Sequence, residues 1–419
     1  MNLLNNLAWA GACLHLHPPA RRLGNIHKLL LAAGVLSGQI ALVQSLSAQG
    51  WTLTSAPTQE WTAVASSADG TRLVAVAEDF PAAPIYVSTN SGATWNQASA
   101  PSHAWSAVAS SADGSVLAAV GNEYPSGPIC VSTDSGASWT QTTAPASDYV
   151  AVAVSANGAT MVATSQAFPS GPIYVSTDSG VTWNQSSVTP SGWSGIACSA
   201  DGTKFVAVAL NFPAGPIYVS DNVGGIWTQS VAPAQEWEAV ASSANGNNLA
   251  AVADTPESIM VSTNSGGTWE YTSAPAQTWS AIASSADGSA LVAAANGGGI
   301  FQSTNSGGTW NDTGAPASSW SAIASSADGN ALVAVVNGGG IYTWQSTPAP
   351  RLRISSSNGG FGISWLIPSL NFTLEQNSNP GTANWTNVAA TPVLNLTNLQ
   401  NQVLIPASIG SQFYRLQSQ

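Results

Sequence analysis

Carboxylates in the predicted loops are the residues of this sequence whose types could support catalysis. A glycoside hydrolase needs only two carboxyl groups, one to protonate the leaving oxygen and one to act as base or nucleophile. The acids that lie outside the regularly repeated turns are Glu60, Glu78, Asp79, Glu123, Asp148, Glu236 and Asp254. No spacing among them singles out one pair, so a two-carboxylate hydrolase stays open as an alternative function.

Aromatic residues that precede proline recur in four of the same loops, at intervals of 44 residues. Flat rings beside planar acceptors bind sugars, because axial C–H groups stack on the ring while hydroxyls are hydrogen-bonded. The sequence therefore predicts a ligand-binding surface, with packing of each ring against its own strands as the alternative. The residues of this surface are Phe80, Tyr124, Phe168 and Phe212, together with Asp79, Glu123 and Asn211.

The sequence lacks the residues that several other kinds of active site need. The only histidine after His27 is His103, which argues against a Ser/His/Asp triad and against a histidine-based metal site. Cys130 and Cys198 replace ordinary residues on different strands of non-adjacent repeats, so we expect two unpaired, buried thiols. We expect neither a metal nor an organic cofactor.

The charge of the chain excludes one class of partner. Only 7% of the 419 residues are charged, the formal net charge is −12 and the pI is about 4.4. Nucleic-acid binding needs a basic patch or stripe. We therefore expect no DNA or RNA partner.

A long internal repeat must position all of these residues. Seven segments similar to "WTAVASSADG" begin at intervals of 41 to 44 residues, and short β-type runs separated by turn residues fill each interval. This period is typical of a β-propeller. The lead aromatics are Trp61, Trp105, Tyr149, Trp193, Trp237, Trp279 and Trp320. They could line a central funnel, but their repetition favours packing between neighbouring blades.

The two ends of the repeat complement each other. A second tryptophan precedes each lead aromatic by ten positions, and Trp51 continues this series before the first copy. The last copy stops after its third strand, so the strand at Trp51 should close the last blade and cover its open edge. The fold class predicted is all-β, with a seven-bladed β-propeller over residues 49–345 that an N-terminal strand closes.

The turn before the second tryptophan carries a family resemblance. "STDSGASW" and "STDSGVTW" match the pattern S-x-D-x-G-x-[TS]-W, and four related copies have Asn in place of Asp. This pattern resembles the Asp-box, or bacterial neuraminidase repeat, of sialidase-like propellers. The resemblance covers about residues 51 to 345 and implies a propeller, while the same box occurs in proteins of different function. The box residues are Asn90, Asp134, Asp178, Asn222, Asn264 and Asn305.

Two observations favour a structural role for the Asp-box and argue against sialidase activity. Asn keeps the hydrogen-bond acceptor of Asp but cannot ionise, so a catalytic acid would not tolerate the exchange. A sialidase-like site would also need an arginine cluster for the substrate carboxylate, whereas the propeller has only Arg72 and Lys204 as basic residues. We expect a noncatalytic protein more than an enzyme.

The two ends of the chain differ in composition from the repeat. Residues 1–48 combine basic residues with an apolar run and a small-residue cleavage point, which predicts an export signal, with a membrane anchor as the alternative. A Pro-containing linker at 346–350 leads to strand-like runs over 351–419. This last part resembles the small β-sandwich appended to exported bacterial proteins, so we predict an accessory or surface-attachment domain, or else a passive cap.

The predicted function is therefore an exported, noncatalytic recognition scaffold. It would act as a monomer in the periplasm, at the cell surface or outside the cell, with no membrane span after signal cleavage. A glycan or an extracellular protein would bind to the face with the long loops. The alternatives are the two-carboxylate glycoside hydrolase and a protein-assembly factor resembling the Asp-box photosystem assembly proteins.

Overall fold

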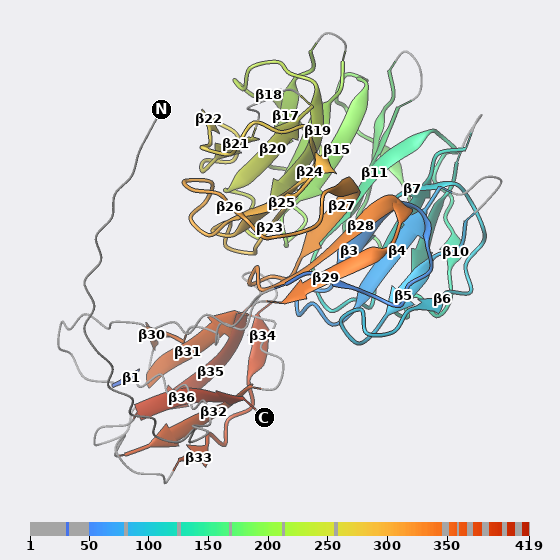
Figure 1. Ribbon diagram of the computed structural model, residues 1–419. Coiled ribbons are helices and arrows are strands. Elements are labelled where there is room, and N and C mark those ends of the chain that lie inside the picture. Colours follow the sequence, from blue (N-terminus) through green and yellow to red (C-terminus); the bar gives the residue numbers. More distant parts are fainter. Residues whose placement is uncertain are drawn as a thin grey trace, which may run out of the picture.

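The computed structural model describes residues 31–32, 50–78, 83–123, 127–166, 170–211, 214–254, 259–345, 352–357, 360–366, 372–378, 385–395, 400–406 and 413–418. These residues form β-strands joined by turns and loops (Figure 1). None of them belongs to a helix that is long and apolar enough to cross a membrane. The predicted all-β propeller fold is confirmed by the sheet topology.

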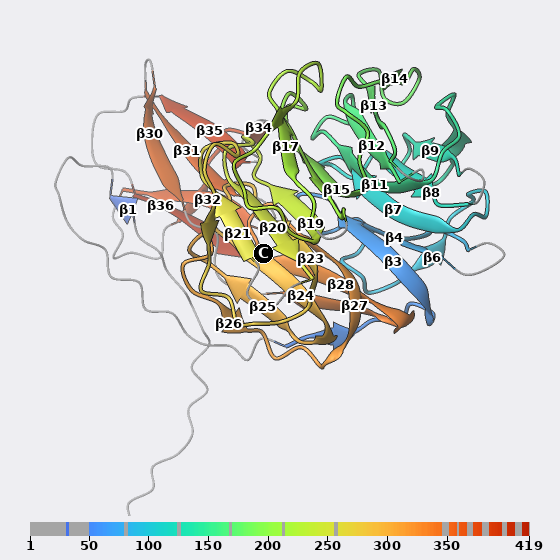
Figure 2. The same cartoon turned by 90° about the horizontal axis from the view of Figure 1, so that it is seen from above.

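Residues 51–345 form seven four-stranded antiparallel blades arranged around an axis (Figures 1 and 2). Blade 1 has β3 (Gln59–Ser66), β4 (Leu73–Ala77), β5 (Tyr86–Ser88) and β6 (Asn96–Gln97), and blade 2 has β7 (Trp105–Ser110), β8 (Leu117–Gly121), β9 (Ile129–Ser132) and β10 (Thr140–Gln141). Blade 3 has β11 (Tyr149–Val154), β12 (Met161–Ser165), β13 (Ile173–Ser176) and β14 (Asn184–Gln185), and blade 4 has β15 (Trp193–Cys198), β16 (Phe205–Ala209), β17 (Ile217–Ser220) and β18 (Thr228–Gln229). Blade 5 has β19 (Trp237–Ser242), β20 (Leu249–Ala253), β21 (Ile259–Ser262) and β22 (Glu270–Tyr271), and blade 6 has β23 (Trp279–Ser284), β24 (Leu291–Gly298), β25 (Ile300–Ser303) and β26 (Asn311–Asp312). Blade 7 has β27 (Ser318–Ser325), β28 (Ala331–Gly339), β29 (Ile341–Gln345) and the N-terminal β2 (Thr52–Leu53).

Small apolar residues allow the blades to pack closely. The second strand of each blade is buried along its alanine and valine run, for example Leu73–Ala77, because neighbouring blades cover both faces of the sheet. One core cluster joins Val74, Val76 and Ile85 of blade 1 to Trp105 and Leu117 of blade 2. The lead aromatics are almost completely buried in such clusters, so they do not line a funnel.

A closed ring of backbone hydrogen bonds links the seven blades. In each blade the alanine after the first strand donates its N–H to the carbonyl of the equivalent alanine in the next blade, over 2.7–2.9 Å. The last bond runs from Ala327 of blade 7 to Ala68 of blade 1, so the ring has no free end. The seven residues are Ala68, Ala112, Ala156, Ala200, Ala244, Ala286 and Ala327.

Side-chain hydroxyls make a second set of bonds between blades. Five residues in the bulge of the first strand donate to the carbonyl of the next blade's lead aromatic, over 2.5–2.7 Å. Blades 3 and 5 have Val150 and Glu238 at this position. The five donors are Thr62, Ser106, Ser194, Ser280 and Ser321.

Both ends of the propeller contribute to blade 7. Thr52 and Leu53 of β2 pair antiparallel with Thr343 and Tyr342 of β29. Trp51 packs against Trp344, with ring centroids 6.5 Å apart, and its indole N–H donates to the Thr313 hydroxyl of blade 6 over 2.8 Å. The N-terminal strand therefore covers the edge of the last blade.

The C-terminal part is a β-sandwich of two sheets, and side chains of both sheets form its core. One sheet has β30 (Arg353–Ser357), β31 (Gly360–Leu366), β35 (Gln400–Pro406) and β34 (Val393–Asn395). The other has β32 (Phe372–Asn377), β33 (Thr386–Asn387) and β36 (Phe413–Ser418), and β1 (Leu31–Ala32) pairs with the edge of β36. Leu394 packs against the alanine ring and Arg353 lies 3.8 Å from the Asp287 carboxylate, so the sandwich contacts the turn end of the propeller.

The two cysteines in the described residues are free thiols, as expected from the sequence, but only Cys130 is buried by its exposed area, while Cys198 is half-buried. Burial raises the pKa of Cys130 to about 11 and the pKa of Cys198 to about 12. Both side chains are therefore protonated at neutral pH, and a protonated thiol is a poor nucleophile.

Replacing Trp51 by Ala tests how far the N-terminal strand stabilises blade 7. The change removes the contact with Trp344 and the hydrogen bond to Thr313. We expect the free energy of unfolding to fall by about 2 kcal/mol, as for a large-to-small change at a partly buried site. Denaturant titration measures the loss, and Tyr271→Ala, at a residue 60% exposed, is the control. Equal stability of the Trp51 and Tyr271 variants would contradict a closing role for this strand.

Candidate functional site

The loops between the second and third strands share one face of the propeller with the connections between blades. We call it the long-loop face. In blades 1 to 4 a residue at the end of each of these loops forms an isolated β-bridge with the following connection. The four bridges join Ala83 to His103, Gly127 to Ser147, Gly171 to Ser191 and Gly215 to Gln235. Each loop is therefore fixed at its base in the same way.

Close backbone contact explains the glycine in two of these bridges. A Cβ atom built on Gly127 would lie 2.0 Å from the Gly121 carbonyl oxygen, and one on Gly215 would lie 1.9 Å from that of Ala209. Only glycine permits this approach. Blade 1 makes its bridge with Ala83, which is fully buried.

Two of the predicted ligand-binding residues reinforce these bases. The Glu123 carboxylate accepts the backbone N–H of Ala104 over 3.0 Å and lies 2.9 Å from Nδ1 of His103. In blade 4 the Asn211 carbonyl accepts the N–H of Gly192 over 3.1 Å, while its amide donates to the Ser191 hydroxyl over 2.9 Å. Both side chains hold the connection that precedes their own blade, and this connection is bridged to the long loop of the blade before it.

The other predicted ligand-binding residues cannot be placed. Asp79, Phe80, Tyr124, Phe168 and Phe212 lie outside the described residues. The binding surface therefore stays a prediction from the sequence. What the structure describes is the support from which the loops project.

Backbone pairing brings some of the predicted acids together. The N–H of Glu78 donates to the Glu60 carbonyl over 3.0 Å, and the N–H of Asp254 donates to the Glu236 carbonyl over 3.1 Å. Each pair joins the start of a first strand to the end of the second strand, near the axis. Asp148 has Gln166 at the matching position, so the acids gather in blades 1 and 5.

Glu238 is an acid of this region that the sequence interpretation missed. It occupies the bulge position at which five other blades have Ser or Thr. Burial raises its pKa, and the nearby carboxylates of Asp254 and Glu236 raise it further. The sequence could have indicated Glu238, because it is charged at a position where the other six blades have a neutral residue.

The long-loop face has little positive charge to balance these acids. Arg72 donates to the Ser135 hydroxyl and Lys204 to the Ser265 hydroxyl, and both acceptors lie in turns at the opposite end of the blades. Within the described residues, no three His, Cys, Asp or Glu side chains are grouped so that they could hold a metal ion. This face is therefore acidic in its described part.

The box residues lie in the turns between the third and fourth strands, at that opposite end, which we call the turn face. Each Asp or Asn oxygen accepts the backbone N–H of the residue four positions later, over 2.8–2.9 Å. In blade 2 the Ser132 and Ser138 hydroxyls also donate to the Asp134 carboxylate. These donors lower the pKa of Asp134 to about 2. The carboxylate is occupied within its own turn.

Comparison with known proteins identifies a shared fold. No family model matches the chain, and no curated protein is similar to it in sequence. In structure it is similar to YCF48 from Cyanidioschyzon merolae, with a TM-score of 0.55 and 14% identity over 70% of this chain and 98% of that chain. YCF48 bound to D1 peptide matches with a TM-score of 0.53 and 16% identity over 73% of this chain and 97% of that chain. Kuenenia stuttgartiensis hydrazine synthase matches with a TM-score of 0.57 and 12% identity over 71% of this chain and 98% of that chain. At such identities the likeness shows the propeller fold alone.

Replacing Glu238 by Ser should stabilise the protein, by about 1 kcal/mol for the hydroxyl bond to the next blade that it restores. The gain should grow as the pH rises above 4.5, the ordinary pKa of Glu, because burial and the neighbouring acids penalise only the ionised side chain. Chemical denaturation at acidic and neutral pH measures both effects. A Glu238→Ser variant less stable than the parent at pH 7 would refute this account.

Asp134 should stabilise its turn only while it is ionised. Its pKa is lowered from 3.8 to about 2 in the folded state, so this stabilisation is present above pH 3.8 and is lost as the pH falls towards 2. Asp134→Asn should remove that pH dependence and keep the turn, because Asn90 also accepts the backbone N–H four residues on, and its amide donates to the Thr94 hydroxyl. Asp134→Ala should be less stable at neutral pH as well. Melting temperatures of the three proteins between pH 2 and 7 test this, and parallel curves for wild type and Asp134→Asn would contradict it.

Proposed function

We propose that the protein is an exported, noncatalytic recognition scaffold that binds a glycan or a protein with the long loops of blades 1 to 4. The observation that carries the proposal is the repeated anchoring of these loops, each by a bridge from its last residues to the next connection. Anchored bases reduce the conformational entropy that loops lose on binding. Four loops held in the same way can present their aromatic residues as one surface.

The charge of this face restricts the partner. Glu60, Glu78, Glu236, Glu238 and Asp254 lie near its axis, while Arg72 and Lys204 point to the turn face. Acidic side chains repel anionic glycans and attract positive charge. Neutral glycans and protein segments rich in Lys or Arg are therefore the partners that suit this face.

Several supporting elements of the proposal come from the sequence. We infer that the chain belongs with the Asp-box, sialidase-like propellers, that residues 1–48 direct export, and that residues 351–419 are an accessory binding or attachment domain. One structural neighbour is YCF48 bound to D1 peptide, so a propeller of this fold can hold a peptide. That likeness supports a protein partner only through the shared fold.

Glycoside hydrolysis is the second candidate, and Glu238 is the observation that favours it. A carboxyl whose pKa is raised by burial and by two neighbouring acids is the arrangement that lets one acid donate a proton while another acts as base. Its partners would be Glu236 and Asp254. Release of reducing sugar from a neutral glycan by the wild type, and its loss in Glu238→Gln, would establish this alternative over the proposal.

A binding screen tests the proposed function. The full chain without residues 1–48 is applied to a glycan array and to immobilised neutral polysaccharides, and to basic and acidic peptides. We expect binding by the wild type and a loss of about a thousandfold when Phe80, Tyr124, Phe168 and Phe212 are all replaced by Ala, because each of the four stacked rings contributes about 1 kcal/mol.

A matched control removes an exposed apolar side chain on the turn face. Val181 is 67% exposed and lies in the box turn of blade 3, so Val181→Ala should bind as the wild type does. Unchanged binding by a folded four-ring variant would show that the site lies elsewhere. Absence of binding to every glycan and peptide would overturn the proposal.

A further inference from the structure

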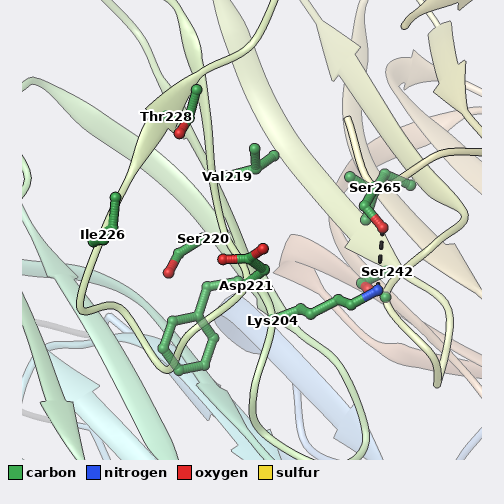
Figure 3. A pocket seen from close by; sticks show the side chains of 11 residues that line it. Lys204, Val219, Ser220, Asp221, Ile226, Thr228, Ser242 and Ser265 are labelled. Atoms are coloured by element: carbon green, nitrogen blue, oxygen red, sulfur yellow. Dashed lines mark hydrogen bonds between the residues drawn. The ribbon is translucent and has the colours of Figure 1, made fainter. Parts of the chain in front are cut away.

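A pocket of about 150 Å³ opens between blades 4 and 5 on the turn face (Figure 3). Blade 4 contributes Lys204, Phe205, Val219 and Asp221 among others, and blade 5 contributes Leu249 and Ser265 among others. The pocket is far from the long loops along each strand, since it lies at the opposite end of the blades. It therefore forms no part of the recognition surface proposed above.

The residues around this pocket depart from the repeat of the chain itself. The box of blade 4 reads "SDNVGGIW", in which Asp221 replaces a Thr that all five other boxes have, and Ile226 replaces a Thr or Ser. Phe205 is an aromatic residue at a position where the other blades have Leu or Met. Because the other blades fold with the ordinary residues, these departures are not needed for the fold.

Two of the departures carry a structural cost. Val223 has a φ of 58°, at a position where the other boxes have Ser. This left-handed conformation is unfavourable for a β-branched residue. Ile226 is 66% exposed, and it lacks the hydroxyl with which Ser138 bonds to Asp134 in blade 2. A sequence that accepts these costs in one blade indicates a role for that blade.

The lining of the pocket combines opposite charges with apolar side chains. The Lys204 ammonium donates to Asn247 Oδ1 over 2.6 Å and to the Ser265 hydroxyl over 3.2 Å, which leaves its third N–H for a ligand. Asp221 lines the same pocket, and within the described residues the two charges form no salt bridge with each other or with a third side chain. Phe205, which stacks on Trp227 with centroids 6.1 Å apart, lines the pocket together with the apolar side chains of Val219 and Leu249.

We propose that this pocket binds a small zwitterion with an apolar side chain, that is, a hydrophobic α-amino acid. The ligand's carboxylate accepts from Lys204, its ammonium donates to Asp221, and its side chain packs on Phe205, Val219 and Leu249. A pocket of this volume suits one side chain of the size of leucine. Both charged groups of the ligand are then paired, as binding in a partly enclosed site requires.

Titration with L-leucine, followed by saturation-transfer NMR on the full chain, tests the proposal. We expect saturation with a dissociation constant of roughly 1 mM. 4-Methylpentanoate lacks the ammonium and isopentylamine lacks the carboxylate, so each should bind about tenfold more weakly or worse. Lys204→Gln and Asp221→Thr should each weaken leucine binding to a similar extent. Asp221→Thr introduces the residue of the five other boxes, so it should fold as they do.

Arg72→Gln is the matched control. Arg72 occupies the position of Lys204 in blade 1 and donates to Ser135 as Lys204 does to Ser265, but its blade has Thr89 in place of Asp221. This variant should bind leucine as the wild type does. Absence of saturation by leucine at about 10 mM would overturn the proposal. Binding of either analogue as tightly as leucine, or a loss of leucine binding in Arg72→Gln equal to that in Lys204→Gln, would overturn it too.

Discussion

The ring of hydrogen bonds between seven alanines is the constraint on which the rest of the structure depends. Each bond joins equivalent backbone atoms of neighbouring blades, and the bond from Ala327 to Ala68 returns the ring to its start. A ring of this kind closes only when every blade is rotated from the next by a similar angle. Small side chains at these positions let the backbones come close enough to bond.

Regular rotation explains why the same contacts recur along the chain. The hydroxyl of Ser106 reaches the Tyr149 carbonyl as that of Ser321 reaches the Trp61 carbonyl, although the second pair is separated by almost the whole propeller in sequence. The same regularity places different features at the two ends of the blades. The bases of the long loops are fixed by bridges at one end of the blades, while the basic side chains Arg72 and Lys204 bond at the other end.

Departures from the repeat are the most informative residues in such a framework. Glu238 replaces a hydroxyl that would bond to the next blade, and burial together with the charges of Asp254 and Glu236 raises the pKa of its carboxyl. Asp221 and Ile226 likewise replace residues that the other boxes share. The exchanges to Glu238 and Ile226 give up a hydroxyl bond that other copies make, so stability alone does not account for them.

The sequence by itself determined the propeller, because the period of the repeat and its alternating small residues are properties of each blade alone. It also located Glu123 and Asn211 in the long loops, but not their partners in the preceding connection, which is bridged to the loop of the blade before. Only the tertiary structure brought Glu238 to Asp254, and Lys204 to Ser265, which is 61 residues away. Contacts of this kind depend on the rotation between blades and on the bulge of the first strand, and neither can be calculated from the order of residues within one repeat.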